Sequence, residues 1–170
     1  MGDVFKEQIV KRKESPLDML KRAGLIIAVI VIFFGVLQTP IATLVPIITL
    51  AAGFGAFYLM SFLRVEYEYV FTNGELDIDI IYNRARRKRV FSANVKSFEV
   101  MAHVEDMNHA GSFKGAHETR DYSSGVVGPD TYAFLISVSG KQTKVIIEPN
   151  EKMMTAISGA VPRSKLHLRK

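Results

Sequence analysis

The distribution of apolar and polar positions divides the chain into two regions. Between Ala23 and Leu63 there is no charged residue, and nearly every side chain is apolar. From Arg64 onwards, apolar and charged residues alternate in short runs that are rich in strand-forming residues. This pattern predicts a membrane-embedded region followed by a β-rich domain, with the boundary between Leu63 and Arg64.

Two transmembrane helices are predicted in the apolar region. A membrane core is crossed by roughly 20 helical residues, so a stretch of 41 residues is long enough for two spans. We expect helix 16–37 to begin after a capping serine, Ser15, with Pro16 in its first turn. After a break at Gln38, helix 40–63 is expected to begin with Thr39 as its cap and to bend at Pro46.

Small residues on the two predicted helices suggest where they meet. Gly53 and Gly55 on the second helix, with the neighbouring alanines 51 and 52, are expected to pack closely against Gly24, Ala28 or Gly35 of the first. Because the two spans contain no buried charge that would mark a transport path, the helices are interpreted mainly as an anchor.

The polar region begins with a predicted β-hairpin. Asn73-Gly74 is a strong turn signal, and the runs on either side of it alternate apolar and polar residues. A two-residue turn would place one set of side chains on a common buried face. That set is Tyr67, Tyr69, Phe71, Leu76, Ile78 and Ile80.

Further strands are predicted near 88–92, 95–102, 118–123, 132–138 and 143–147, and helical spacing of Met153, Met154 and Ile157 predicts a helix after Asn150. The fold class is therefore an α+β membrane protein, in which the transmembrane hairpin precedes a seven-stranded antiparallel β-barrel or sandwich that ends with a helix. The predicted parts are a cytosolic N-terminal segment (1–15), the hairpin (16–63), a cytosolic β domain (64–162) and a basic tail (163–170). Within the N-terminal segment, residues 4–13 are weakly amphipathic, so a helix in the membrane interface is one interpretation of them.

Seven strands closed by a C-terminal helix resemble the pleckstrin-homology-like (PH-like) architecture. The segment Phe71-Thr72-Asn73-Gly74-Glu75-Leu76-Asp77-Ile78-Asp79 and the basic run after it also resemble a family of uncharacterised bacterial two-helix membrane proteins with a domain of unknown function. The resemblance covers nearly the whole chain. It supports the anatomy described above, but it carries no known activity and so gives no support to any mechanism.

Basic residues flank the two predicted spans on one side only. Arg64 and a basic run follow the second span, and the turn between the spans has no basic residue. Six basic residues precede the first span: Lys6, Lys11, Arg12, Lys13, Lys21 and Arg22. Cytosolic loops carry an excess of Lys and Arg, so both termini of this multi-pass protein are predicted on the cytosolic side of the plasma membrane.

The candidate binding residues are the cations of that basic run: Arg84, Arg86, Arg87, Lys88 and Arg89. One interpretation is that they bind the anionic headgroups of membrane lipids, with about 1 kcal/mol from each cation near the surface. The other is that they neutralise an acidic face of the hairpin formed by Glu66, Glu68, Asp77 and Asp79. A protein partner is a further possibility. Nucleic acid is disfavoured because no recognition motif accompanies the run.

Metal and catalytic chemistry find little support in the sequence. The chain has no cysteine, which excludes disulfides and thiolate metal sites. Alternating acids usually mark a solvated strand face, although the four acids named above could also hold a divalent cation. His103, His109 and His117 lie in a glycine-rich segment, but their spacing matches no zinc motif, and an ordinary polar loop is expected there. We therefore expect no enzyme, no cofactor and no metal.

The leading hypothesis is a membrane-anchored PH-like binding or scaffolding module that recognises a protein partner, an anionic lipid or a second copy of itself. The alternative is an accessory subunit of a larger membrane complex, assembled through its transmembrane helices.

Overall fold

The computed structural model describes residues 4–167, which form two compact units. The helical unit comprises Glu14–Val65 together with the turn Tyr82–Ala85. The β unit comprises the rest of the described chain, namely residues 4–13, 66–81 and 86–167. The β unit therefore includes the segment before the first helix. Of the predicted basic tail, Arg169 and Lys170 lie outside the described residues.

Helix α1 (Pro16–Leu37) has the predicted bounds. The Ser15 side chain accepts a hydrogen bond from the backbone N–H of Leu17, and the Ser15 backbone N–H donates to Asp18 at 3.2 Å. This reciprocal capping box satisfies two N–H groups that would otherwise lack partners at the start of the helix. The helix start was predictable because the signal lies within four consecutive residues.

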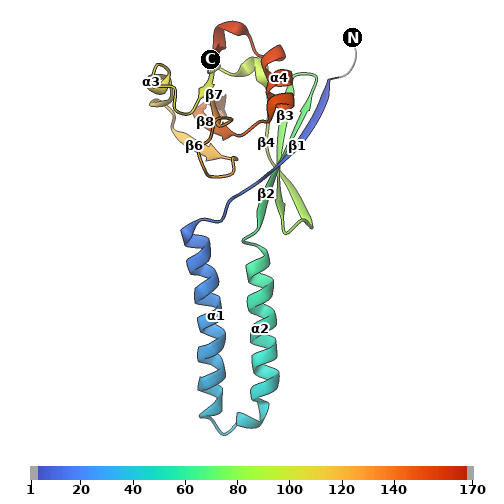
Figure 1. Ribbon diagram of the computed structural model, residues 1–170, viewed down its shortest axis with the longest axis vertical. Coiled ribbons are helices and arrows are strands. Elements are labelled where there is room, and N and C mark those ends of the chain that lie inside the picture. The colour runs from blue at the N-terminus through green and yellow to red at the C-terminus, as the bar shows by residue number, and fades with distance from the viewer. Residues whose placement is uncertain (1–3, 168–170) are drawn as a thin grey trace. The chain divides into compact units, whose positions relative to one another are not determined.

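The second helix begins later than predicted. A short 3₁₀ turn (Ala42–Leu44) precedes α2 (Val45–Ser61), and α1 and α2 lie side by side (Figure 1). The bend expected at Pro46 is wrong, because Pro46 lies in the first turn of α2, where proline costs no helical hydrogen bond. Thr39 does not cap α2: its hydroxyl donates to the carbonyl of Val36 at 2.7 Å, at the end of α1.

Close packing at the helix glycines is also not observed. A Cβ atom placed on Gly24, Gly35, Gly53 or Gly55 would meet no atom within 4 Å. The contact between α1 and α2 therefore does not require glycine at these positions, and their small surface stays open.

The first sheet contains four strands in the order β1 (Phe5–Lys11), β2 (Val65–Thr72), β3 (Glu75–Tyr82) and β4 (Arg86–Asn94). The predicted hairpin at Asn73-Gly74 is confirmed. Both turn residues have positive φ, 49° and 94°, which suits the tight turn between twisted strands. The expected buried face is confirmed for Tyr67, Tyr69, Phe71, Leu76 and Ile78, whereas Ile80 is only half-buried.

The interfacial helix considered for residues 4–13 does not form, since most of this segment is strand β1. Strand β1 pairs antiparallel with β2, from Phe5 opposite Thr72 to Lys11 opposite Glu66. Its polar Gln8 joins the C-terminal part of the β unit: the side chain donates to the carbonyl of Glu148 at 2.9 Å and accepts from the N–H of Asn150 at 2.8 Å. The helical spacing of apolar residues was misleading because a distant strand supplies the backbone partners.

The second sheet has five strands in the order β6 (Glu118–Asp121), β8 (Lys141–Ile147), β7 (Tyr132–Val138), β5 (Val100–His103) and β9 (Leu166–His167). The predicted strand near 118–123 is confirmed as β6. The pairs β6–β8 and β5–β9 are parallel, so the expectation of an entirely antiparallel domain is wrong. Nine strands, rather than seven, occur in residues 4–167, and the two sheets do not close into a barrel.

Helix α4 (Glu151–Ala160) follows the second sheet, as predicted. Asn150 caps it by accepting a hydrogen bond from the N–H of Met153 at 2.9 Å, and Met153 and Ile157 are buried. In the core, the rings of Phe98 and Phe134 stack with centroids 3.9 Å apart. One short helix, α3 (Ala110–Phe113), was not predicted.

Candidate functional site

The basic run begins in a tight turn and continues along β4. Asn83 and Arg84 form the turn with positive φ values of 50° and 56°, and the N–H of Ala85 bonds back to the carbonyl of Tyr82. The N–H of Asn83 also donates to the carbonyl of Arg64 at 3.0 Å, just after α2. The turn is thereby fastened to the end of the second helix. All five cations of the run have exposed side chains.

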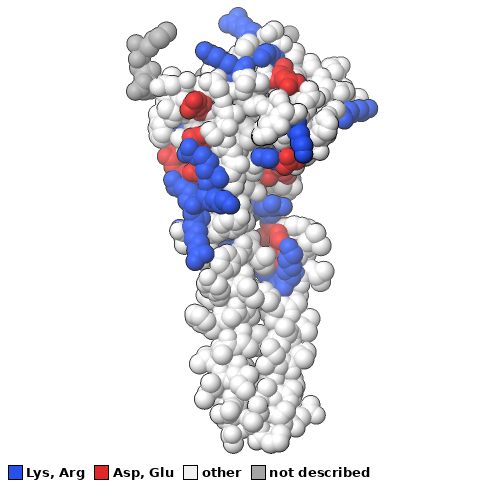
Figure 2. Space-filling model, turned by 180° about the vertical axis from the view of Figure 1, so that it is seen from behind, with Lys and Arg blue, Asp and Glu red and all other residues white. Residues whose placement is uncertain are grey.

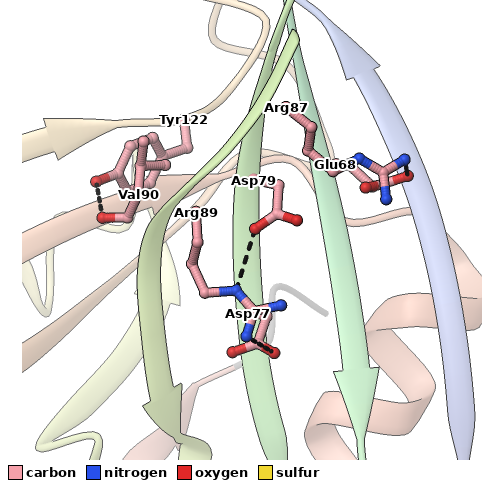
Figure 3. A network of polar contacts seen from close by, with 7 residues as sticks. All are labelled: Glu68, Asp77, Asp79, Arg87, Arg89, Val90 and Tyr122. Atoms are coloured by element: carbon pink, nitrogen blue, oxygen red, sulfur yellow. Dashed lines mark hydrogen bonds and ion pairs between the residues drawn. The ribbon is translucent and has the colours of Figure 1, made fainter.

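Two arginines of the run pair with the acidic face of the hairpin (Figure 3). Arg87 Nη2 lies 2.7 Å from Glu68 Oε1. Arg89 contacts two carboxylates, Asp77 at 2.9 Å and Asp79 at 3.2 Å. The charge-pairing interpretation therefore holds for Arg87 and Arg89, which nevertheless remain more than half exposed.

The acidic face is not the solvated strand face that alternation favours. Glu68 is only 1% exposed and Asp79 only 7%. Burial raises the pKa of Glu68 above its ordinary value of 4.5, and the neighbouring carboxyl of Glu7 raises it further, while Arg87 lowers it. A buried carboxylate needs a charged or hydrogen-bonding partner. Arg87 supplies that partner from β4, across the intervening strand β3.

Tyrosines connect the two sheets beside this network. The hydroxyl of Tyr122 donates to the carbonyl of Val90 in β4 at 3.4 Å (Figure 3). The buried hydroxyl of Tyr69 donates to the carbonyl of Tyr122 at 2.6 Å and accepts from the N–H of Glu148 at 3.2 Å. Desolvation by burial is the largest cause of a strongly raised pKa for Tyr69, so the hydroxyl stays protonated as a structural cross-link.

The structure separates the three histidines that were considered as metal ligands. His103 is buried: its Nδ1 accepts from the N–H of Glu105, which leaves Nε2–H to donate to the carbonyl of Gly128 at 3.0 Å. His109 bonds Asp106 at 2.9 Å, and this hydrogen bond is the main reason that the pKa of Asp106 lies below its ordinary value. His117 is exposed.

Neither the histidines nor the acidic face forms a metal centre in the part of the chain that the structure describes. Within residues 4–167 there is no group of three or more His, Asp or Glu side chains arranged to hold an ion. The segment around His103 is also more than an ordinary loop, because hydrogen bonds to Gly128 and Glu105 fix His103 in the core.

A second polar cluster, which the sequence analysis did not identify, lies at the charged end of the helical unit. The cluster surrounds a cavity of about 200 Å³. Its lining comes from α1, from the end of α2 and from the turn before β4: Arg22, Phe57, Met60, Ser61, Arg64 and Asn83. The only signal in the sequence is that Arg22 and Arg64 are the last charges on either side of the apolar region.

The chain matches a known protein family over nearly its whole length. The family described as "Bacterial PH-like domain (DUF6106)" matches residues 2–166, a range that includes both apolar helices as well as the β unit. No curated protein and no solved structure matches the chain.

Proposed function

Since this chain belongs to the family of bacterial PH-like domains (DUF6106), we propose that it is a membrane-anchored binding module without enzymatic activity. In this proposal α1 and α2 cross the plasma membrane, and the β unit lies on the cytosolic side. The exposed basic run contacts the anionic headgroups of the inner surface. The observation that carries the proposal is the hydrogen bond from Asn83 to Arg64, which fastens the start of the basic run to the end of α2.

The surface of the two helices supports the membrane anchor. Helix α1 has 22 residues and the second apolar helical segment, Ala42–Ser61, has 20, so each is long and apolar enough to cross a membrane. In the helical unit, Leu50 exposes 77% of its surface and Phe54 exposes 72%. Figure 2 shows this surface without Lys, Arg, Asp or Glu along most of its length. A soluble protein rarely exposes so large a continuous apolar surface.

The cytosolic side is supported by the distribution of basic residues. Arg22 and Arg64 bracket the apolar region, and the link between the helices carries no charge. Such an excess of basic residues on one side marks the cytosolic face. The same face carries the negative surface potential that attracts Lys and Arg.

A spin label tests the contact between the basic run and lipid. The chain has no native cysteine, so Ala85→Cys carries a single nitroxide between Arg84 and Arg86. The full chain is placed in nanodiscs of phosphatidylglycerol or of phosphatidylcholine, and collision of the label with a water-soluble nickel complex is measured. We expect fewer collisions in phosphatidylglycerol, and we expect 0.5 M salt to remove the difference because salt screens headgroup contacts.

The matched variant carries serine at Arg84, Arg86 and Lys88, which leaves the Arg87 and Arg89 pairs intact. The proposal predicts equal collisions in the two lipids for this variant. Equal collisions for the unmodified run would contradict a lipid-binding role and would direct the search to a protein partner.

A second candidate function, an accessory subunit assembled through the helices, rests on a groove in the helical unit. The groove is apolar apart from one hydroxyl, and its lining includes Phe33, Val45, Pro46, Thr49, Gly53 and Phe54. The Thr49 hydroxyl is buried and has no hydrogen-bond partner among the described residues. Filling the groove with Thr49→Leu and Gly53→Leu would lower the particle mass in native nanodiscs if a partner helix occupies it, and would leave a solitary module unchanged.

A further inference from the structure

The cavity at the charged end of the helical unit has the composition of an anion site. Two arginines, a serine and an asparagine line it, and none of its six lining residues is acidic. A water molecule takes about 30 Å³ of liquid volume, so a cavity of about 200 Å³ admits a group with several oxygen atoms. The two apolar lining residues, Phe57 and Met60, provide a hydrophobic wall on the α2 side.

Arg22, one of the residues that line the cavity, has an unused donor. Its Nη1 pairs with Glu14, but its Nη2 is buried and has no hydrogen-bond partner in residues 4–167. The side chain as a whole is only 23% exposed. A buried guanidinium nitrogen without an acceptor costs free energy, and native structures almost always satisfy such groups. An oxygen atom of an anion in the cavity would satisfy it.

The other polar residues fit the same ligand. Arg64 adds a second guanidinium, and arginine favours phosphate because its planar N–H groups match the spacing of phosphate oxygens. Asn83 is held at the cavity by its backbone bond to the carbonyl of Arg64. The hydroxyl of Ser61 already donates to the carbonyl of Tyr58 at 2.6 Å, so the remaining donors belong to the arginines and the asparagine.

The surroundings indicate that the phosphate belongs to a lipid. Arg22 and Arg64 are the charges nearest to the apolar region on either side, so a membrane around the helices would place the cavity at headgroup depth. Phe57 exposes 71% of its surface next to the cavity, where the apolar part of a lipid could lie. Free inorganic phosphate has no apolar part that could contact Phe57.

We propose that this cavity holds the phosphate of an anionic phospholipid, with Arg22 Nη2 and the guanidinium of Arg64 as its donors. One lipid would be retained by each chain, at a site separate from the exposed basic run. The inference rests on the membrane placement of α1 and α2 proposed above.

Native mass spectrometry of the full chain tests the site. The protein is purified in detergent, and phosphatidylglycerol or phosphatidylcholine is added at matched concentrations. We expect one retained phosphatidylglycerol per chain and at least tenfold weaker retention of phosphatidylcholine. Arg22→Gln with Arg64→Gln should weaken retention of phosphatidylglycerol at least tenfold, whereas Lys114→Gln with Lys152→Gln removes two exposed charges elsewhere and should leave it within twofold.

A second variant protects the test against misfolding. Ser61→Leu narrows the cavity and keeps both arginines, so it should also weaken retention, while circular dichroism confirms the helices and the β unit of each variant. Retention of phosphatidylglycerol by both the arginine variant and Ser61→Leu would overturn the proposal. Displacement of the lipid by millimolar inorganic phosphate would also overturn it, because the site would then serve the free anion.

A third variant separates this proposal from the function proposed above. If Arg86→Gln with Lys88→Gln removes the retained lipid and the arginine variant keeps it, the lipid occupies the basic run and the cavity proposal is wrong. If the chain partitions into the aqueous phase without detergent, the membrane anchor itself is wrong.

Discussion

The helical unit and the β unit place their apolar side chains in opposite ways. In the β unit, Tyr69, Phe98 and Phe134 are fully buried, whereas in the helical unit Leu50 and Phe54 are more than 70% exposed. Burying one large apolar side chain stabilises a fold by about 1.5–3 kcal/mol. The β unit obtains this stabilisation from its own core, while the helical unit obtains it only from an apolar environment. The comparison indicates that the two regions are suited to different solvents.

The two units also treat charge differently. The helical unit has no charge between Ala23 and Leu63 and keeps its arginines at one end. The β unit brings carboxyl groups inside, as with Glu68 and Asp79, and pairs them with exposed arginines of β4. The basic run therefore combines two roles. Arg87 and Arg89 stabilise the sheet through their ion pairs, and all five cations form the exposed surface that we propose contacts lipid.

The largest expected effect compares one aromatic residue from each unit. Phe134→Ala removes a ring that stacks on Phe98 in the core and should lower the free energy of unfolding of the β unit by about 3–5 kcal/mol. Phe54→Ala removes an exposed ring and should change the free energy of unfolding of the β unit by less than about 0.5 kcal/mol. Urea unfolding in detergent, followed by the near-ultraviolet circular dichroism of the tyrosines, measures both. If both variants lost a similar amount of unfolding free energy, the two units would not differ in how they use their apolar side chains.

Removal of Arg87 should give the next largest effect. Arg87→Ala leaves the Glu68 carboxylate without its cation and should lower the free energy of unfolding by about 1–3 kcal/mol. Lys88→Ala, at the next position, which is also exposed, should change the free energy of unfolding by less than about 0.5 kcal/mol. In a double-mutant cycle, Glu68→Gln should make the Arg87 substitution less costly. Additive effects would show that the pair is not coupled.

Gln8 tests whether the N-terminal segment belongs to the β unit. Gln8→Ala removes two hydrogen bonds, to Glu148 and from Asn150, and should lower the free energy of unfolding by about 1–2 kcal/mol. Hydrogen exchange at the amide of Asn150 should accelerate as well. Lys6→Ala, at an exposed position of the same strand, serves as the control. An interfacial helix would make the two substitutions equivalent.

The smallest expected effect is a dependence on pH. Because the pKa of Glu68 is raised in the folded state, its favourable contribution is complete below about pH 4.5 and is lost as the pH rises through the folded pKa. The stability of the protein relative to Glu68→Gln should therefore fall as the pH rises above 4.5. Asp106 has a lowered pKa, so the advantage over Asp106→Asn should be present above pH 3.8 and disappear on acidification. The same direction for both pairs of proteins would contradict these assignments.

Local signals explain what the sequence made predictable. The Ser15 capping box, the Asn73-Gly74 turn and the Asn150 cap each lie within a few consecutive residues, and α1, the hairpin and α4 follow them closely. The family match confirms the PH-like assignment. In the candidate site, the pairing of Arg87 and Arg89 with the acidic hairpin was one of three interpretations of the basic run that the sequence left open.

Features that depend on distant segments were not predictable in the same way. Strand β1 pairs with β2 across more than fifty residues of chain, and its local spacing fits a helix equally well. The burial of Glu68 depends on how β1 and β4 flank the hairpin, and the parallel pairing of β6 with β8 depends on a long connection. The cavity around Arg22 and Arg64 draws on three segments, so no local motif marks it.

Cysteine labelling in intact bacterial cells tests the central claim, a membrane-anchored module with a cytosolic β unit. Because the chain has no native cysteine, Gln38→Cys reports only on the link between α1 and α2, and Lys141→Cys only on the exposed start of β8. A membrane-impermeant maleimide should label Gln38→Cys once the outer permeability barrier is opened, and should label Lys141→Cys only after the cells are lysed. Labelling of Lys141→Cys before lysis, with Gln38→Cys protected, would reverse the orientation and contradict the account.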